Sequence, residues 1–126
     1  MTVSTFKRYE KKFLLNEAQY QAILPVLLQY MCLDKFCKDE QEYTISNVYY
    51  DTDQSSIIRH SLSKPYYKEK LRLRSYSLIN SPNCKVFLEL KKKIGGVVTK
   101  RRAVLTLSEA YDFLEHGTRP QKCEYL

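Results

Sequence analysis

The sequence predicts an α+β fold in which helices pack against one face of an antiparallel sheet. Three consecutive segments alternate apolar and charged residues, as strands with one buried face do: residues 67–78, 85–93 and 97–107. Their connections are short, with a turn at Ser81-Pro82-Asn83 and a tight hairpin at Gly95-Gly96. Consecutive strands joined by such short turns run antiparallel, so these three form the centre of the sheet.

Helical segments lie before and after these strands. Asn16 is expected to cap a helix with Gln19 as its capping-box partner, and apolar residues at helical spacing extend this helix to about Cys32. Pro25 lies inside it and predicts a kink or a break. A last short helix is expected to begin after Ser108 as its cap and to end at Gly117.

Two further strands complete the expected sheet, at residues 5–14 and 42–50. The second ends in Asp51-Thr52-Asp53, which can cap a short helix that runs through Ile57 and Ile58 towards His60. No internal repeat and no linker interrupts the chain, so residues 1–126 are expected to form one domain.

Composition narrows the classes of function. The 126 residues are 44% hydrophobic with only three glycines, which excludes a disordered or collagen-like chain. No apolar run is long enough to span a bilayer and no secretory signal is visible, so a cytoplasmic protein is expected. The four cysteines match no paired metal spacing and are expected to be free thiols. A net charge of +7 favours an anionic partner: nucleic acid, an acidic membrane surface or a phosphorylated molecule.

Positive charge gathers on one face of the predicted sheet. The alternation places leucines on one side of each strand and basic residues on the other. A sheet face exposed to solvent also produces this alternation of apolar and charged residues. Such a face normally carries both positive and negative side chains, because like charges on neighbouring strands destabilise the pairing. A multivalent anion would supply the missing negative charge. The residues expected on this face are Lys70, Arg72, Arg74, Glu89, Lys91, Lys93, Lys100 and Arg102.

Five short motifs, taken in order, resemble those of the VTC domain, the catalytic domain of polyphosphate polymerases of the vacuolar transporter chaperone family. They are RYEKKF at 8–13, VYYDT at 48–52, LRLRSY at 71–76, FLELK at 87–91 and TKRR at 99–102. The resemblance implies a CYTH-like triphosphate tunnel, an antiparallel barrel of eight strands with charged residues inside. It extends over the N-terminal half of that tunnel, so a partial barrel is expected.

The resemblance also implies a site. It assigns phosphate binding to six basic residues and a divalent metal, Mg²⁺ or Mn²⁺, to the carboxylates of Glu10 and Glu89. The implied ligands are polyphosphate, tripolyphosphate or a nucleoside triphosphate, and the implied reaction transfers a nucleotide γ-phosphoryl group to a polyphosphate chain. The six basic residues are Lys12, Arg72, Arg74, Lys91, Lys100 and Arg102.

Two other functions stay open at this point. The eleven tyrosines would suit a basic nucleic-acid-binding module. No nucleic-acid motif is present, however, and Tyr49, Tyr50, Tyr66 and Tyr67 do not interleave with the basic strand positions. The second alternative is a non-catalytic domain that binds polyanions or associates with itself. An incomplete barrel leaves unpaired strand edges, so a homodimer is expected. Arg72 and Arg74 are expected to point into solvent or ligand, with little part in folding.

Overall fold

A computed structural model describes residues 11–37, 42–122 and 124–125 of the chain. The chain divides into two compact units. One unit spans residues 10–43 and contains the first helix. The other unit includes residues 44–126, which contain the strands described below and the candidate site. Each unit is described by itself.

The first unit is built on helix α1, Glu17–Tyr30. The side chain of Asn16 accepts a hydrogen bond from the Gln19 backbone at 2.9 Å, and the Gln19 side chain accepts one from the Asn16 backbone at 2.9 Å. This reciprocal pair confirms the predicted capping box. The sequence predicts a kink or a break at Pro25, and the helix continues through this residue without a break. Of the strand expected at residues 5–14, residues 5–10 lie outside the described part of the chain and residues 11–14 are not a strand.

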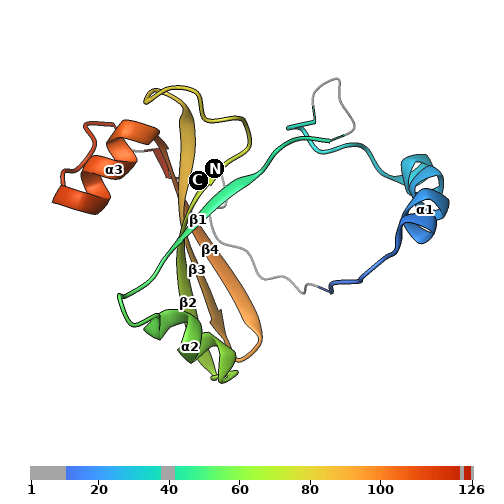
Figure 1. Ribbon diagram of the computed structural model, residues 1–126, viewed down its shortest axis with the longest axis horizontal. Coiled ribbons are helices and arrows are strands. Elements are labelled where there is room, and N and C mark those ends of the chain that lie inside the picture. Colours follow the sequence, from blue (N-terminus) through green and yellow to red (C-terminus); the bar gives the residue numbers. More distant parts are fainter. Residues whose placement is uncertain (1–10, 38–41, 123, 126) are drawn as a thin grey trace. The chain divides into compact units, whose positions relative to one another are not determined.

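The second unit is an antiparallel sheet in the order β1-β2-β3-β4-β5. Its strands are β1 (Ser46–Tyr50), β2 (Tyr67–Ser75), β3 (Lys85–Ile94), β4 (Val97–Thr106) and β5 (Glu124–Tyr125). Strands β1 to β4 therefore confirm, with slightly different ends, the four strands predicted from residue 42 onward, whereas β5 corresponds to no predicted strand. The sheet is strongly curled but not closed into a barrel, which confirms the α+β prediction of a partial, curled sheet (Figure 1).

Helix α2, Ser56–Leu62, follows β1. Its N-cap residue, Ser55, makes no side-chain capping bond and has a left-handed φ of 56°. The Asp51 carboxylate caps the helix instead, accepting hydrogen bonds from the backbone N–H groups of Ile57 at 2.8 Å and Ile58 at 3.0 Å. The predicted cap from residues 51–53 is therefore confirmed.

Helix α3, Leu107–His116, begins two residues earlier than its predicted cap implies. Its N-cap is Thr106 and the prediction of Ser108 is wrong. Thr106 Oγ1 accepts a hydrogen bond from the Glu109 backbone at 3.2 Å, and the Glu109 carboxylate accepts one from the Thr106 backbone at 2.9 Å. Glu109 lies three residues after Thr106, which makes a capping box that Ser108 could not form. Gly117 ends the helix with a φ of 71°, as predicted.

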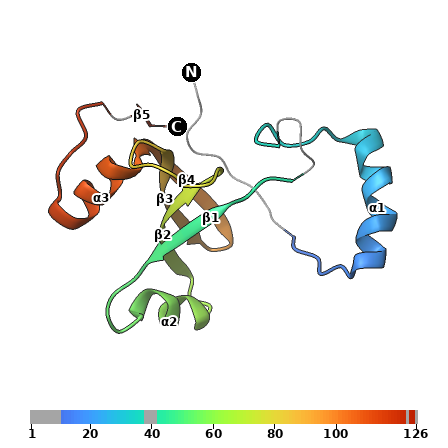
Figure 2. The ribbon, with the colours of Figure 1, turned by 45° about the horizontal axis from the view of Figure 1, so that its top comes forward.

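The core lies on the apolar face of the sheet. Leu73, Val86 and Leu105 from three neighbouring strands pack against Ala110 of α3, and all four are buried. Helix α3 contacts β3 and β4, whereas α2 contacts β2, and the two helices lie at opposite ends of the sheet (Figures 1 and 2). The residues that alternate with these core positions point to the opposite face, which carries the charges.

Candidate functional site

The strand register arranges the charged face in rows that cross the sheet. Residues directly opposite one another on neighbouring strands belong to one row, and successive rows are two residues apart, about 7 Å. The arginine row consists of Tyr49, Arg72, Glu89 and Arg102. The lysine row beside it consists of Lys70, Lys91 and Lys100. In the row on the other side, Arg74 lies opposite Asn47 and Phe87.

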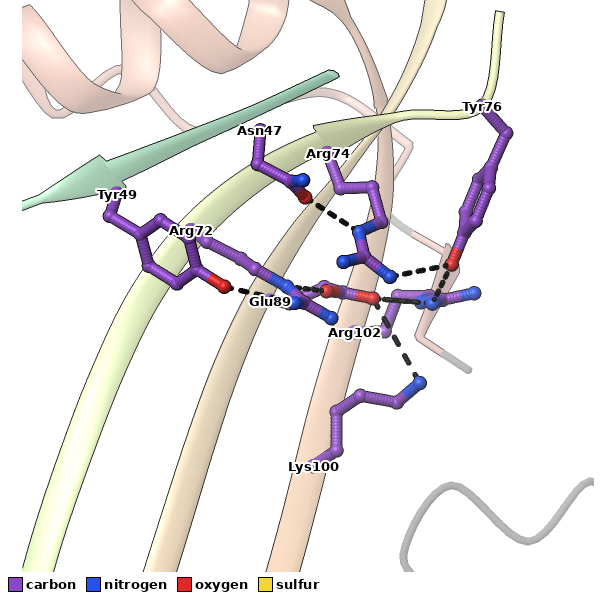
Figure 3. Close-up of polar contacts among 8 residues, drawn as sticks. All are labelled: Asn47, Tyr49, Arg72, Arg74, Tyr76, Glu89, Lys100 and Arg102. Carbon is purple, nitrogen blue, oxygen red and sulfur yellow. Dashed lines mark hydrogen bonds and ion pairs between the residues drawn. The ribbon is translucent and has the colours of Figure 1, made fainter. Parts of the chain in front are cut away.

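Glu89 is the centre of the arginine row. Its side chain is 0% exposed, and Arg72 and Arg102 approach it from the strands on either side (Figure 3). Arg72 Nε donates a hydrogen bond to Glu89 Oε2, and Arg102 Nε donates one to Oε1 at 2.7 Å. Lys100 Nζ lies 3.9 Å from Oε1. Both oxygens of the carboxylate are therefore engaged by guanidinium groups.

The ionisation of Glu89 follows from these contacts. Burial by itself raises the pKa of a carboxyl group, because it disfavours the charged form. Hydrogen bonds from Arg72 and Arg102, together with their positive charges, outweigh that effect and hold the pKa of Glu89 below its usual value. Glu89 is an anion at neutral pH.

Arg72 is more deeply placed than the sequence predicts. It is only 8% exposed, and besides its bond to Glu89 it donates a hydrogen bond from Nη1 to the Tyr49 hydroxyl at 3.2 Å. This bond, with the charges of Arg72, Arg74 and Lys70, lowers the pKa of Tyr49. Removing Arg72 would leave the buried Glu89 carboxylate with one partner fewer, so we expect Arg72 to contribute to folding, unlike the expectation from the sequence.

Tyr76 joins the two remaining arginines. Its hydroxyl accepts hydrogen bonds from Arg102 Nη2 at 2.9 Å and from Arg74 Nη1 at 3.4 Å, while its ring packs edge-on against Phe87 with centroids 5.4 Å apart. Arg74 Nε donates to Asn47 Oδ1 at 2.7 Å. Burial alone would raise the pKa of Tyr76, but the two guanidinium groups lower it overall.

One pattern unites Arg72, Arg74 and Arg102. In each of them Nε donates to a side-chain acceptor of the protein, and a second nitrogen donates to a tyrosine hydroxyl. A guanidinium group carries five N–H donors, so the contacts described leave donors on every one of the three for a further acceptor. The arrangement can bind an anion with several oxygens, and phosphate suits the planar geometry of arginine.

The other predicted phosphate ligands have different outcomes. Lys91 and Lys100 lie in the lysine row, on the face where the sequence places them. Lys12 belongs to the unit of residues 10–43 and precedes α1, so its role stays a prediction.

The described residues do not fit a divalent cation. Of the two predicted metal ligands, Glu10 lies outside them, and Glu89 has both oxygens engaged by guanidinium groups. Residues 11–37 and 42–122 contain no cluster of three or more His, Cys, Asp or Glu side chains that could hold a metal. Hard cations such as Mg²⁺ need several oxygen ligands, and here Glu89 is surrounded by positive charge instead.

Sequence reasoning missed three polar residues of the site: Asn47, Tyr49 and Tyr76. Asn47 and Tyr49 alternate along β1 and therefore share a face, but which face depends on the register with β2, which the sequence does not fix. Tyr76 follows Arg74 by two residues and lies just after the end of β2. Extending the alternation of β2 by one residue would have placed Tyr76 on the same face as Arg74.

Comparison with known protein families identifies the family of the chain. The sequence model of the VTC domain family matches residues 7–124. The chain belongs to the VTC domain family. No curated protein and no solved structure gives a match. Within the described parts of this VTC domain, no helix has the length and apolar character needed to cross a membrane.

Proposed function

We propose that the charged sheet face of this VTC domain binds a phosphate chain: polyphosphate, tripolyphosphate or the triphosphate of a nucleotide. The observation that carries the proposal is the set of three arginines whose Nε groups are tied to the protein while other N–H groups remain for a ligand. Family membership supports it, since the VTC domain is the domain of polyphosphate polymerases.

The distribution of charge favours a ligand with several linked anionic groups. The lysine row continues from the arginine row along the strands, so cationic side chains occupy successive rows of the same face. Within these rows the one carboxylate is that of Glu89, and it is already engaged by Arg72 and Arg102. A phosphate chain that crosses both rows would neutralise charges that otherwise repel one another across neighbouring strands.

The reaction belonging to this proposal is transfer of a nucleotide γ-phosphoryl group to a polyphosphate chain. Positioning and charge neutralisation dominate catalysis of phosphoryl transfer, and these are the contributions that the arginine and lysine rows can make. Arg72, Arg74 and Arg102 would orient phosphate oxygens through fixed donors, and Lys70, Lys91 and Lys100 would offset the negative charge of the chain.

Calorimetric titration of the full chain with tripolyphosphate tests the binding proposal. Arg74→Gln removes a cation whose described partners, Asn47 and Tyr76, are uncharged, so it should weaken binding by about 1.5–3 kcal/mol with little effect on folding. Arg101→Gln is the matched control, since Arg101 neighbours Arg102 on β4 but points to the opposite face and is exposed. Equal affinity of the parent and both variants would refute the proposal.

A nucleic-acid ligand is the competing outcome. A competition titration between tripolyphosphate and an oligonucleotide of equal charge distinguishes a phosphate-chain ligand from a nucleic-acid ligand. The proposal predicts that tripolyphosphate displaces the oligonucleotide, because the arginine cluster binds compact groups of phosphate oxygens. Preference for the longer strand would instead indicate an open surface that binds by charge alone.

We also propose that two copies of the chain form a homodimer. Among the strands of the described residues β1 lies at one edge of the sheet, and Val48 and Tyr49 on it are about half exposed. Exposed strand edges favour pairing with a second chain. Light scattering should therefore give twice the mass of one chain, and tripolyphosphate should strengthen the association. A monomer with and without tripolyphosphate would exclude it.

A further inference from the structure

We propose that Glu89 is a positioning residue, an internal anion that holds Arg72 and Arg102 in a geometry ready to bind phosphate, and that it is not a metal ligand. This inference rests on the proposed phosphate-binding function. It assigns to the buried carboxylate a role opposite to the one that the family resemblance implies.

The contacts of Glu89 support this role directly. One oxygen accepts from Arg72 and the other accepts from Arg102, while Lys100 Nζ stands 3.9 Å from Oε1 (Figure 3). A divalent cation at this carboxylate would have to displace two guanidinium groups and would then lie among three positive charges. Coulomb repulsion at such short range opposes that exchange, most of all at a side chain with no exposed surface.

The position of Glu89 in the sheet explains what the carboxylate does. Arg72 and Arg102 lie on the two strands that flank β3, about 10 Å apart in the hydrogen-bonding direction, and Glu89 occupies the place between them. The length of the glutamate side chain lets one carboxylate meet the Nε group of both. Without it, two guanidinium groups on the same face would repel each other and adopt several rotamers.

Fixing Nε leaves other nitrogens of each guanidinium group for the ligand. Arg72 Nη1 is oriented by Tyr49, and Arg102 Nη2 by Tyr76. A phosphate oxygen therefore meets donors whose conformational freedom is already reduced, so less entropy is lost on binding. Glu89 contacts Nε of Arg72 and both Nε and Nη2 of Arg102, so among the contacts of the described residues Arg72 Nη2 and Arg102 Nη1 are the nitrogens left for an external anion.

Glu89→Asp separates this role from the alternatives. Aspartate keeps the charge and the ability to bind a metal but is one methylene shorter, so it cannot reach both Nε groups. In EDTA-containing buffer the variant should bind tripolyphosphate at least about tenfold more weakly than the parent. Glu69→Asp is the matched control: Glu69 lies on β2, is exposed, and pairs with Lys92 at 3.9 Å. It should bind like the parent.

A second measurement decides the question if Glu89→Asp does not fold. In the parent, ¹⁵N NMR signals of the Arg72 and Arg102 Nε–H groups should not broaden when Mn²⁺ is added without phosphate. Broadening of these signals by Mn²⁺ would place a metal at Glu89 and overturn the inference. A folded Glu89→Asp variant that binds tripolyphosphate as tightly as the parent in EDTA would also overturn the inference. A parent that does not bind tripolyphosphate would instead refute the proposed function, while the Mn²⁺ result would still judge the role of Glu89.

Discussion

The arginine row and the lysine row are neighbours on one sheet face, and they differ in how their cations are held. In the arginine row, guanidinium groups are fixed by a buried carboxylate and by tyrosine hydroxyls. In the lysine row, the closest approach to that carboxylate is 3.9 Å, from Lys100. A guanidinium group offers a planar set of donors, whereas an ammonium group is a point charge on a flexible stem. The arginine row therefore supplies geometry and the lysine row supplies charge.

Removing a guanidinium group from the arginine row should have the largest effect. Arg72→Ala takes away one of two hydrogen-bonded partners of a buried carboxylate, and should lower the free energy of unfolding by about 3 kcal/mol in a urea titration. This loss is at the low end for a broken buried pair, because Arg102 and Lys100 still face Glu89. Arg101→Ala should change stability by no more than about 0.5 kcal/mol. Equal losses in both variants would show that the buried pair contributes nothing special.

Acid should weaken the same cluster. The folded-state pKa of Glu89 lies below the usual value of 4.5, so its contribution to stability is complete above that value and is lost as the pH falls through the folded-state pKa. Melting temperatures of the parent should therefore fall steeply below about pH 4.5. The Glu89→Gln variant should have a lower melting temperature at neutral pH, and its melting temperature should fall less steeply over the same pH range. Parallel curves for the two proteins would contradict the assigned ionisation.

Exchanging the two cation types tests the comparison itself. Arg72→Lys keeps the charge but cannot bond to Glu89 and Tyr49 in the same way, so tripolyphosphate affinity should fall about tenfold. Lys70→Arg also keeps the charge and should change affinity by less than about threefold, because position matters less in the lysine row. Isothermal titration of both variants measures the difference. Equal changes would mean that the two rows bind in the same manner.

Loss of a single lysine charge should have the smallest effect. Lys70 is partly exposed, so Lys70→Gln should cost about 1 kcal/mol of binding free energy or less at low salt. The difference from the parent should shrink as salt is raised, because mobile ions screen partly exposed charges. A salt series of tripolyphosphate titrations measures this. A difference that persists unchanged in high salt would assign Lys70 a fixed, desolvated contact instead.

The sequence predicts the faces of the strands but not the contacts across them. Alternation along β2 and β4 correctly places Arg72, Arg74 and Arg102 on one face, opposite Leu73 and the other core positions. The engagement of Glu89 by two arginines depends on register, and a shift of one residue would have put other side chains opposite it. The two-residue turn at Gly95-Gly96 sets the register of β3 with β4, but the connection between β2 and β3, residues 76–84, is longer and leaves the register of Arg72 with Glu89 open in the sequence.

Local chemistry explains the other differences. The capping boxes at Asn16 and Thr106 have the same spacing, a polar cap followed three residues later by Gln or Glu. The first is predicted correctly and the second is misplaced, because Ser108 is also a good cap by residue type and only the Glu109 partner distinguishes Thr106. The pairing of cap and partner is thus more informative than the cap residue alone.

The most direct test of the proposed phosphate-binding face is an NMR titration of arginine Nε–H signals with tripolyphosphate, using the full ¹⁵N-labelled chain. Arg101 and Arg119 serve as internal references, since both are exposed and Arg101 points to the opposite face of β4. We expect the signals of Arg72, Arg74 and Arg102 to shift together and to saturate with one binding constant, while the two references stay unchanged. Shifts confined to Arg101 and Arg119, or no saturable shift in the three, would contradict it.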